Sequence, residues 1–304
     1  NTWLGLRDIF YLRSKFVLGG ICRKKSIKSA QKSKIGFFLS SKDKDRSRLD
    51  DALNMKDVKD YFNESSLNYN FDKKLFKKYM SSLHKIEYDN LNNNLKDNEK
   101  KFFNFLENKN VAIVGNALSE NDDGLEIDSF DLVLRLNHIN LNDKFDIRKK
   151  GSKTDITYVN GKIVDSLFDR NSAIANQVKA VVFKFNNLDK VKKFQELNPN
   201  LIIKATNNYN FFSFYSSFNL LPITLFDLLE TNVKKIKIFH LDLHLSKKKL
   251  YYPYLITPTE NEKKKLGLQS FVKHDPMSQH EFLKNLYENP KITGDEKVDE
   301  IMKL

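Results

Sequence analysis

The sequence predicts an α/β fold: a Rossmann-like, mostly parallel sheet flanked by helices, with an N-terminal helical extension. Two observations lead to this prediction. From residue 110 onward, six short segments rich in Val, Ile and Phe are separated by polar stretches, as buried strands are. Several of the intervening stretches carry apolar residues at helical spacing. Strands that alternate with helices favour a parallel sheet that is covered on both faces.

The N-terminal third lacks this alternation. Residues 1–48 open with "WLGLRDIFYLRSKFVLGG", which predicts a short basic amphipathic helix that suits packing on the domain or contact with an anionic membrane. The rest of this segment is basic and Ser-rich, and we expect it to be flexible. Over residues 49–108, apolar residues recur at helical spacing in "LFKKYMSSLHKI" and "KKFFNFLENK", which predicts a helical lead-in.

The predicted strands and helices follow in order along the remainder of the chain. The strands are "VAIVG", "DLVLRL", "DITYV", "VKAVVFKF", "LIIKA" and "KIKIFHL". Helices are predicted at 162–169, 187–197, 219–231 and about 277–288, the last with Pro276 and Ser278 at its entry.

Two of the predicted strands end in an asparagine. Gly115 lets the chain turn as it leaves the first strand, Asn116 follows, and Asn137 holds the equivalent place after the second strand. Ligands of parallel α/β sheets bind at the carboxyl ends of the strands. An uncharged amide can hold a phosphate or sugar oxygen there; the alternative is that both asparagines cap turns. The chain has neither G-x-G-x-x-G nor G-x-x-x-x-G-K-[ST], so it supports neither a dinucleotide site nor a P-loop.

Composition narrows the partners and the compartment. The 52 basic and 39 acidic residues give a net charge of +13, which suits nucleic acid, an anionic membrane or a nucleotide-linked substrate, or reflects a Lys-rich composition alone. The single cysteine, Cys22, permits no internal disulfide, and no stretch of the sequence is long and apolar enough to span a bilayer. We expect a cytoplasmic protein, with peripheral contact on the inner face of the membrane left open.

Four blocks in order resemble the large sialyl motif of family 29 sialyltransferases. They are Val114-Gly115-Asn116, Ile127–Asp131, Arg135-Leu136-Asn137 and Gly151–Asp155, within residues 111–160. The resemblance implies a sialyltransferase-type variant of the nucleotide-sugar transferase fold over 109–304. It also implies transfer of sialic acid from a CMP-linked donor to a glycan hydroxyl, with inversion and without a metal or other cofactor. The lack of paired cysteines favours a bacterial type of enzyme, as in capsule or lipooligosaccharide biosynthesis.

The resemblance also implies donor-binding residues. Asn116 and Asn137 would bind CMP beside Gly115, while Ser152 and Thr154 would shape the neighbouring loop. The family's second motif has Ser/Thr-Gly before a helix and a strand. Here the matching region is "SSFNLLPITLFDLLETNVKKIKIFHLDL", which lacks the glycine.

In that region Ser217 and Asn219, with Ser216, could donate to ribose or to a carboxylate. Asp242, after the next strand, aligns loosely with an acidic position of bacterial members, which suggests a contact with the donor sugar or the acceptor.

Transfer needs a proton acceptor for the attacking hydroxyl, and a histidine suits that role at neutral pH. We predict His274, because it stands just before the last predicted helix. It has Gln279 five residues on, where the family has Glu after its base. The alternative is a turn histidine bonded to backbone. His280 is expected on the helix surface.

The sequence also leaves open a metal site and functions of other kinds. His240-x-Asp242-x-His244 would place three metal-ligand side chains on one strand face, but no clear fourth ligand is nearby and no metal is predicted. The nearest functional rival is a CMP-Kdo transferase of surface polysaccharide synthesis. Two alternatives belong to other classes of protein. One is a basic nucleic-acid-binding protein, although no nucleic-acid recognition motif is found in the sequence, and the other is an inactive transferase-like binding module.

Overall fold

The computed structural model describes most of the chain after residue 92. The described residues are 93–117, 119–138, 146–161, 163–169, 176–184, 188–206, 218–241, 274 and 276–303, with Leu6, Arg7, Leu18, Ile21, Cys22 and Lys25. Most of the predicted N-terminal segment 1–48, the lead-in over 49–92, and the site residues Ser217 and Asp242 lie outside them. The structure therefore leaves those predictions untested.

Contacts along the backbone divide the chain into two compact units. One comprises Asn1–Asp89, Tyr209–Asn219 and Pro258–Asn285, and the other Asn90–Asn208, Leu220–Thr257 and Leu286–Leu304. The chain passes between them more than once. The predicted domain limits at 48 and 108 stay predictions.

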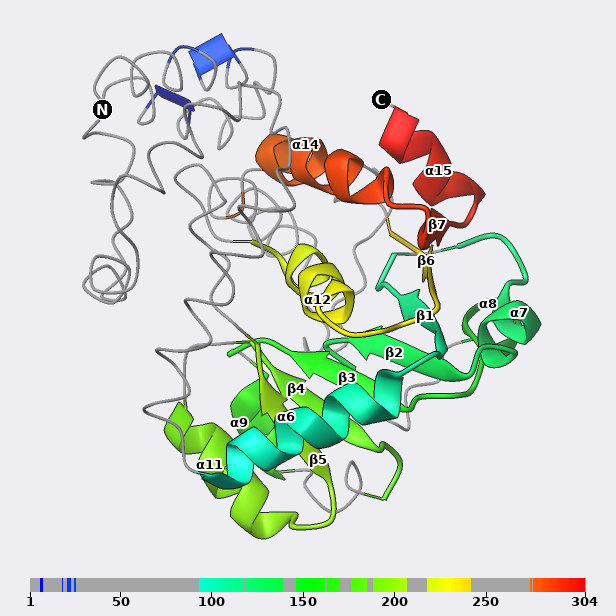
Figure 1. Cartoon of the computed structure of the whole chain (residues 1–304). Coiled ribbons are helices and arrows are strands. Elements are labelled where there is room, and N and C mark those ends of the chain that lie inside the picture. The colour runs from blue at the N-terminus through cyan, green and yellow to red at the C-terminus, as the bar shows by residue number, and fades with distance from the viewer. Residues whose placement is uncertain are drawn as a thin grey trace. The chain divides into compact units, whose positions relative to one another are not determined.

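The second unit is built on a seven-stranded sheet whose strand pairs are all parallel (Figure 1). The order is β5-β4-β3-β2-β1-β6-β7. The six predicted strands are confirmed, and β7 is an addition that the sequence did not predict. The strands are β1 (Asn110–Val114), β2 (Leu132–Leu136), β3 (Ile156–Val159), β4 (Ala180–Phe183), β5 (Ile202–Ala205), β6 (Lys235–Phe239) and β7 (Ile292–Gly294).

Helices alternate with these strands along the chain. The helices predicted at 162–169, 187–197, 219–231 and 277–288 are confirmed with small shifts of their ends. None of the described helices is long and apolar enough to cross a membrane. They are α6 (Asn93–Leu106), α7 (Gly124–Asp128), α8 (Ile147–Lys150), α9 (Val164–Asp169), α11 (Leu188–Leu197), α12 (Leu220–Leu229), α14 (Pro276–Tyr287) and α15 (Glu296–Lys303).

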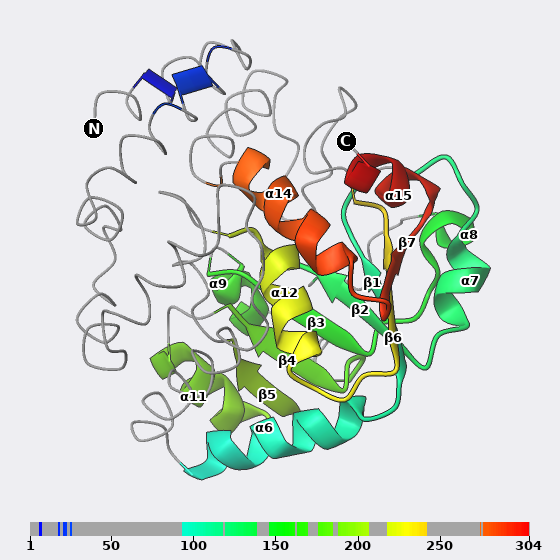
Figure 2. The same cartoon turned by 45° about the horizontal axis from the view of Figure 1, so that its top comes forward.

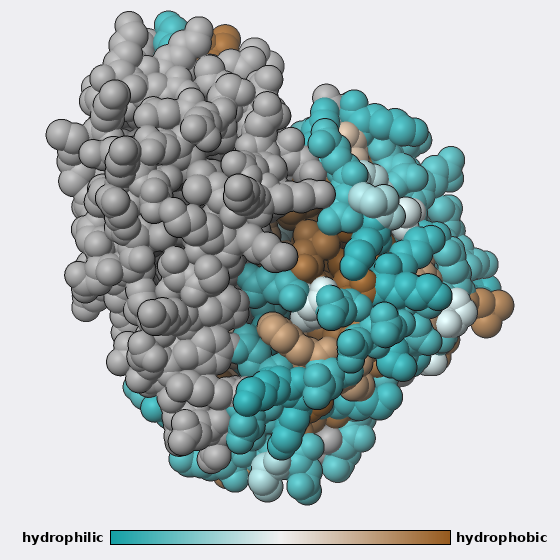
Figure 3. Space-filling model, in the orientation of Figure 1, coloured by the Kyte–Doolittle hydropathy of each residue, from teal (hydrophilic) through white to brown (hydrophobic). Residues whose placement is uncertain are grey.

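The core lies on the two faces of this sheet. Alternate strand residues point to opposite faces, and Val159, Val181 and Ile203 pack on one face against Leu167 of α9 and Phe194 of α11. Helices α6 and α12 lie over the other face (Figures 1 and 2). The described residues on the outer surface are mainly hydrophilic in the view of Figure 3. The apolar runs of the sequence are thus accounted for by burial in the sheet.

A buried ion pair joins the sheet to α6 and α12, the helices on the second of these faces. Lys204 of β5 pairs with Asp227 of α12, and its Nζ lies 3.7 Å from Glu99 of α6 and 5.1 Å from the ring centre of Phe102. The hydroxyl of Tyr158 donates to Asp227 at 2.6 Å. Burial lowers the pKa of Lys204, but nearby carboxylates, Asp227 first and then Glu99 and Glu230, outweigh burial and hold that pKa above its ordinary value. Lys204 therefore stays charged, and its contacts tie both helices to the sheet.

The central strands β1 and β6 come unusually close where they end. The amide of Gly115 donates to Phe239 at 2.8 Å, and that of Ala117 donates to the carbonyl of His240 at 3.0 Å. A Cβ on Gly115 would overlap that same His240 carbonyl oxygen. His240 itself has a φ of 57°, a backbone conformation that favours glycine. Gly115 is therefore required by packing.

We predict that Gly115→Ala lowers the free energy of unfolding by about 1–3 kcal/mol, as overpacking does. The matched control is Gly161→Ala, since a Cβ there meets nothing within 4 Å. Thermal or denaturant unfolding of the two variants checks the difference. Equal stability of both variants would contradict the close approach.

Candidate functional site

The order in which strands are added to the sheet reverses at β1, and this switch point is a favourable place for a binding site. Strands β2 to β5 follow on one side of β1, whereas β6 and β7 lie on the other. Ligands of such sheets bind outside the carboxyl ends of the strands at this switch point. Gly115 and Asn116 follow β1 directly, Asn137 and His138 follow β2, and His240 follows β6. The structure thus brings together three of the predicted residues, Gly115, Asn116 and Asn137.

The two asparagines are held by the main chain and keep amide donors for a ligand. Asn116 Nδ2 donates to the carbonyl of Leu136 at 3.1 Å. Asn137 Oδ1 accepts from the amide of Asn160 at 3.0 Å, which directs its Nδ2 away from that contact. The φ of Asn137 is 55°, a conformation that asparagine tolerates better than most residues. Their geometry suits the binding of phosphate or sugar oxygens.

A buried arginine organises the segment between α8 and β3. Arg135 is 4% exposed, and its Nη2 donates to the carbonyls of Lys150 at 2.7 Å and Gly151 at 3.2 Å. Its Nε donates to Thr154 Oγ1 at 2.9 Å and to the Lys153 carbonyl at 3.2 Å. Burial lowers the pKa of Arg135 to about 10, so it remains a cation at neutral pH. One side chain therefore fixes four residues of this segment, Lys150, Gly151, Lys153 and Thr154.

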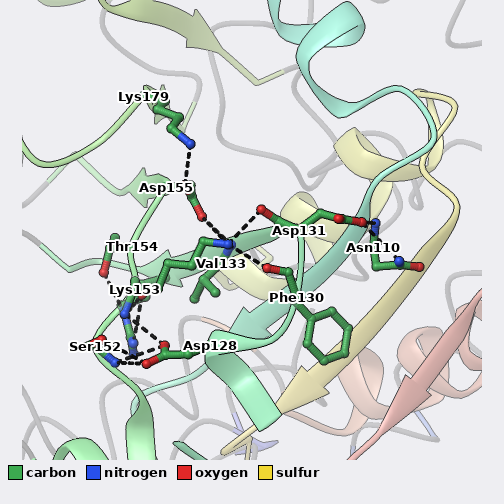
Figure 4. Close-up of polar contacts among 11 residues, drawn as sticks. Asn110, Asp128, Phe130, Asp131, Val133, Ser152, Lys153, Thr154, Asp155 and Lys179 are labelled. Atoms are coloured by element: carbon green, nitrogen blue, oxygen red, sulfur yellow. Dashed lines mark hydrogen bonds and ion pairs between the residues drawn. The ribbon is translucent and has the colours of Figure 1, made fainter. Parts of the chain in front are cut away.

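An aspartate at the end of α7 holds the same segment from the other side (Figure 4). The carboxylate of Asp128 accepts from the amides of Ser152 at 2.8 Å and Lys153 at 2.9 Å, and from Ser152 Oγ at 2.9 Å. Burial raises the pKa of Asp128, but these hydrogen bonds outweigh burial and hold that pKa below its ordinary value. Gly151, with a φ of 67°, makes the turn into this contact.

The hydroxyls of Ser152 and Thr154 are therefore hydrogen-bonded to other residues of this chain, Asp128 and Arg135. Both precede β3 and so stand at its amino end, while Asn116 and Asn137 follow the carboxyl ends of their strands. Nearby, Lys153 Nζ donates to the carbonyls of Phe130 and Asp131 at 2.6 and 2.8 Å (Figure 4). The described contacts give this segment the role of a fixed support, and its direct contact with a donor stays a prediction.

Lys150 carries a positive charge to the carboxyl end of β1. It is the last residue of α8, and its Nζ lies 3.4 Å from the carbonyl oxygen of Gly115. Burial and repulsion by Arg135 lower the pKa of Lys150 to about 8. The sequence did not single it out.

His240 closes the site from the side of β6. Its Nε2 lies 3.1 Å from Asp123 Oδ2, and its buried Nδ1 has no hydrogen-bond partner. Burial, followed by repulsion from Lys150, lowers the pKa of His240 to about 4, so the ring is neutral at pH 7. Burial and then Glu126 raise the pKa of Asp123.

Ligand atoms of Asp123, His240 and Asp295 lie within 4.8 Å of one another, which raises the question of a metal. Both oxygens of Asp295 already accept main-chain amides, from His240 at 2.7 Å and from Val298 at 2.8 Å. Asp295 thus caps α15 and anchors the end of β6. These contacts give Asp295 a structural role, and metal independence stays a prediction. Of the alternative set His240-x-Asp242-x-His244, Asp242 and His244 lie outside the described residues.

The other compact unit contains Asn219 and His274. The side chain of Gln279 is fully buried and links them: its Oε1 accepts from the amide of Asn219 at 2.8 Å, and its Nε2 donates to the carbonyl of His274. His274 is half-buried just ahead of α14, whose first residue is Pro276. Gln279, noted in the sequence only for its offset, therefore fixes the backbone at both predicted residues.

Comparison with known proteins assigns the chain to a family. The model of glycosyltransferase family 29 (sialyltransferase) matches residues 49–246, which is 198 of the 304 residues. No curated protein matches the chain at a significant level.

Similar solved structures include the Campylobacter jejuni sialyltransferase CstII with cytidine-5'-monophosphate (19% identity, 62% of this chain, 79% of that chain, TM-score 0.42). A second is an apo alpha-2,3-sialyltransferase from Campylobacter jejuni (16% identity, 62% of this chain, 76% of that chain, TM-score 0.38). A third is a mammalian sialyltransferase (15% identity, 74% of this chain, 85% of that chain, TM-score 0.40). These TM-scores support no residue-level comparison, so the assignment rests on the family model. The chain belongs to glycosyltransferase family 29, the sialyltransferases.

Proposed function

We propose that the protein transfers sialic acid from a CMP-linked donor to a glycan hydroxyl, with inversion and without a metal ion. The acceptor class we propose is a bacterial surface glycan, with the enzyme working in the cytoplasm or on the inner face of the membrane. The supporting observation is the pair Asn116 and Asn137. They lie on adjacent strand ends at the switch point, inside the matched region, and each amide retains donor capacity.

The chemistry assigns separate tasks to these residues. The asparagine amides would hold oxygens of the CMP part, where an uncharged donor binds phosphate without reacting with the sugar. The acceptor hydroxyl would attack the anomeric carbon and form the new C–O bond. The bond from that carbon to the phosphate oxygen would break, and CMP would leave with the electron pair. His274 would take the proton of the hydroxyl as general base.

Thermal unfolding with a panel of nucleotides tests the donor class directly. CMP and CMP-sialic acid should raise the Tm, because they bind the native state alone, whereas UDP- and GDP-sugars should not. A larger shift with CMP-Kdo than with CMP-sialic acid would replace sialic acid with Kdo in the proposal. No shift with any cytidine nucleotide would overturn the donor assignment.

We predict that Asn116→Ala and Asn137→Gly each weaken CMP binding by about 1–3 kcal/mol, the cost of unpaired polar groups. Glycine is chosen at 137 because it keeps the positive φ while removing the amide. Calorimetry measures the affinity. Unchanged CMP affinity in both folded variants would remove the asparagines from the donor site.

The proposed reaction needs no divalent ion, so EDTA should leave activity unchanged. The Asp123–His240–Asp295 cluster is the place in the described residues where an ion could bind. If EDTA abolishes transfer and manganese restores it, metal independence is wrong. Asp123→Asn would then show whether this cluster is responsible.

We predict that His274→Ala lowers kcat by roughly 10²–10⁴-fold with little effect on CMP affinity, as expected for loss of a general base. In the wild type, kcat should rise with pH as the base loses its proton, and this limb should vanish in the variant. His280→Ala, on α14, is the matched control and should keep its activity. More than a tenth of wild-type turnover in His274→Ala would move the role to His240 or His244.

A further inference from the structure

The position of Lys150 is fixed by the main chain around it. Its amide donates to the carbonyl of Asp146 at 2.9 Å, and its carbonyl accepts from Arg135 at 2.7 Å. Gly151 follows with a left-handed φ and leads away toward Asp128. The side chain is thereby directed back across the strand ends, where Nζ lies 3.4 Å from the Gly115 carbonyl oxygen.

The ammonium group lies among the ends of three strands. It contacts Gly115, after β1, and its charge lowers the pKa of His138, after β2, and of His240, after β6. Those are the three strands that meet at the switch point. Burial and Arg135 both oppose this cation. A bound anion would favour it, because opposite charges attract more strongly away from bulk water.

We propose that Lys150 is a ligand of the donor phosphate, binding it beside Asn116 at the carboxyl end of β1. This inference rests on the proposed CMP-linked donor. It adds a charged residue to a phosphate site whose other proposed ligands are the side-chain amides of Asn116 and Asn137. A phosphodiester donor carries one negative charge on phosphate, and the CMP that leaves carries a second as the anomeric C–O bond breaks. Lys150 stabilises that developing charge, so it acts on turnover as well as on binding.

The test compares CMP with cytidine, which lacks the phosphate. Lys150→Met keeps the length and apolar stem of the side chain and removes the charge. CMP affinity should fall about 10- to 100-fold, as for loss of a charge-assisted hydrogen bond, while cytidine affinity stays unchanged. Lys150→Arg should recover part of the CMP affinity, and kcat of Lys150→Met should fall along with it.

Lys149→Met is the matched control, since this neighbouring lysine pairs with Glu120 at 3.5 Å instead. It should bind CMP and cytidine like the wild type. Equal CMP affinity in Lys150→Met and wild type overturns the inference, and so does an equal loss for CMP and cytidine, which indicates a structural role. If the wild type binds cytidine nucleotides not at all, the proposed function fails first and this inference fails with it.

Discussion

The candidate site depends on one buried cation, the guanidinium of Arg135. A planar group with five donors can satisfy several carbonyls at once, which a lysine ammonium cannot do in the same geometry. Here it binds the carbonyls of Lys150, Gly151 and Lys153, between α8 and β3. This segment carries Lys150 at one end and Thr154 at the other. Without the guanidinium, buried carbonyls would be left unpaired, and the segment would have no fixed position against β2.

The second constraint is the close approach of β1 and β6. Because Gly115 has no side chain, the chain leaving β1 can pass against the carbonyl of His240. The left-handed φ of His240 turns the chain sharply after β6, and Asp295 holds that turn through the His240 amide. Asn137 makes the corresponding turn after β2. Two turns with a left-handed φ thus follow the strands on either side of β1, and backbone of this kind is typical of functional sites.

The sheet was readable from the sequence because buried parallel strands are continuous apolar runs. β7 was missed because it has only three residues and ends in Gly294, too little for a pattern. The short helices α7 and α8 escaped notice for a different reason: tertiary contacts such as that of Asp128 with Ser152 define them, not periodicity. Gly115, Asn116 and Asn137 could be found from strand-end position. Lys150 could not, since it is one of 52 basic residues and only folding brings it to Gly115.

Lys204 and Lys150 show why burial alone does not identify a functional cation. Lys204 is paired with Asp227 and lies near Glu99, and its pKa is raised in spite of burial. Its charge is satisfied inside the fold, and removing a partner would leave an uncompensated ion in the core. Burial and the nearby Arg135 guanidinium lower the pKa of Lys150 to about 8. A bound anion would lie close to both cations at that strand end and reduce their mutual repulsion. The position of each ammonium separates the two lysines: Lys204 joins the sheet to its helices, whereas Lys150 reaches the carboxyl ends of the strands, where ligands of such sheets bind.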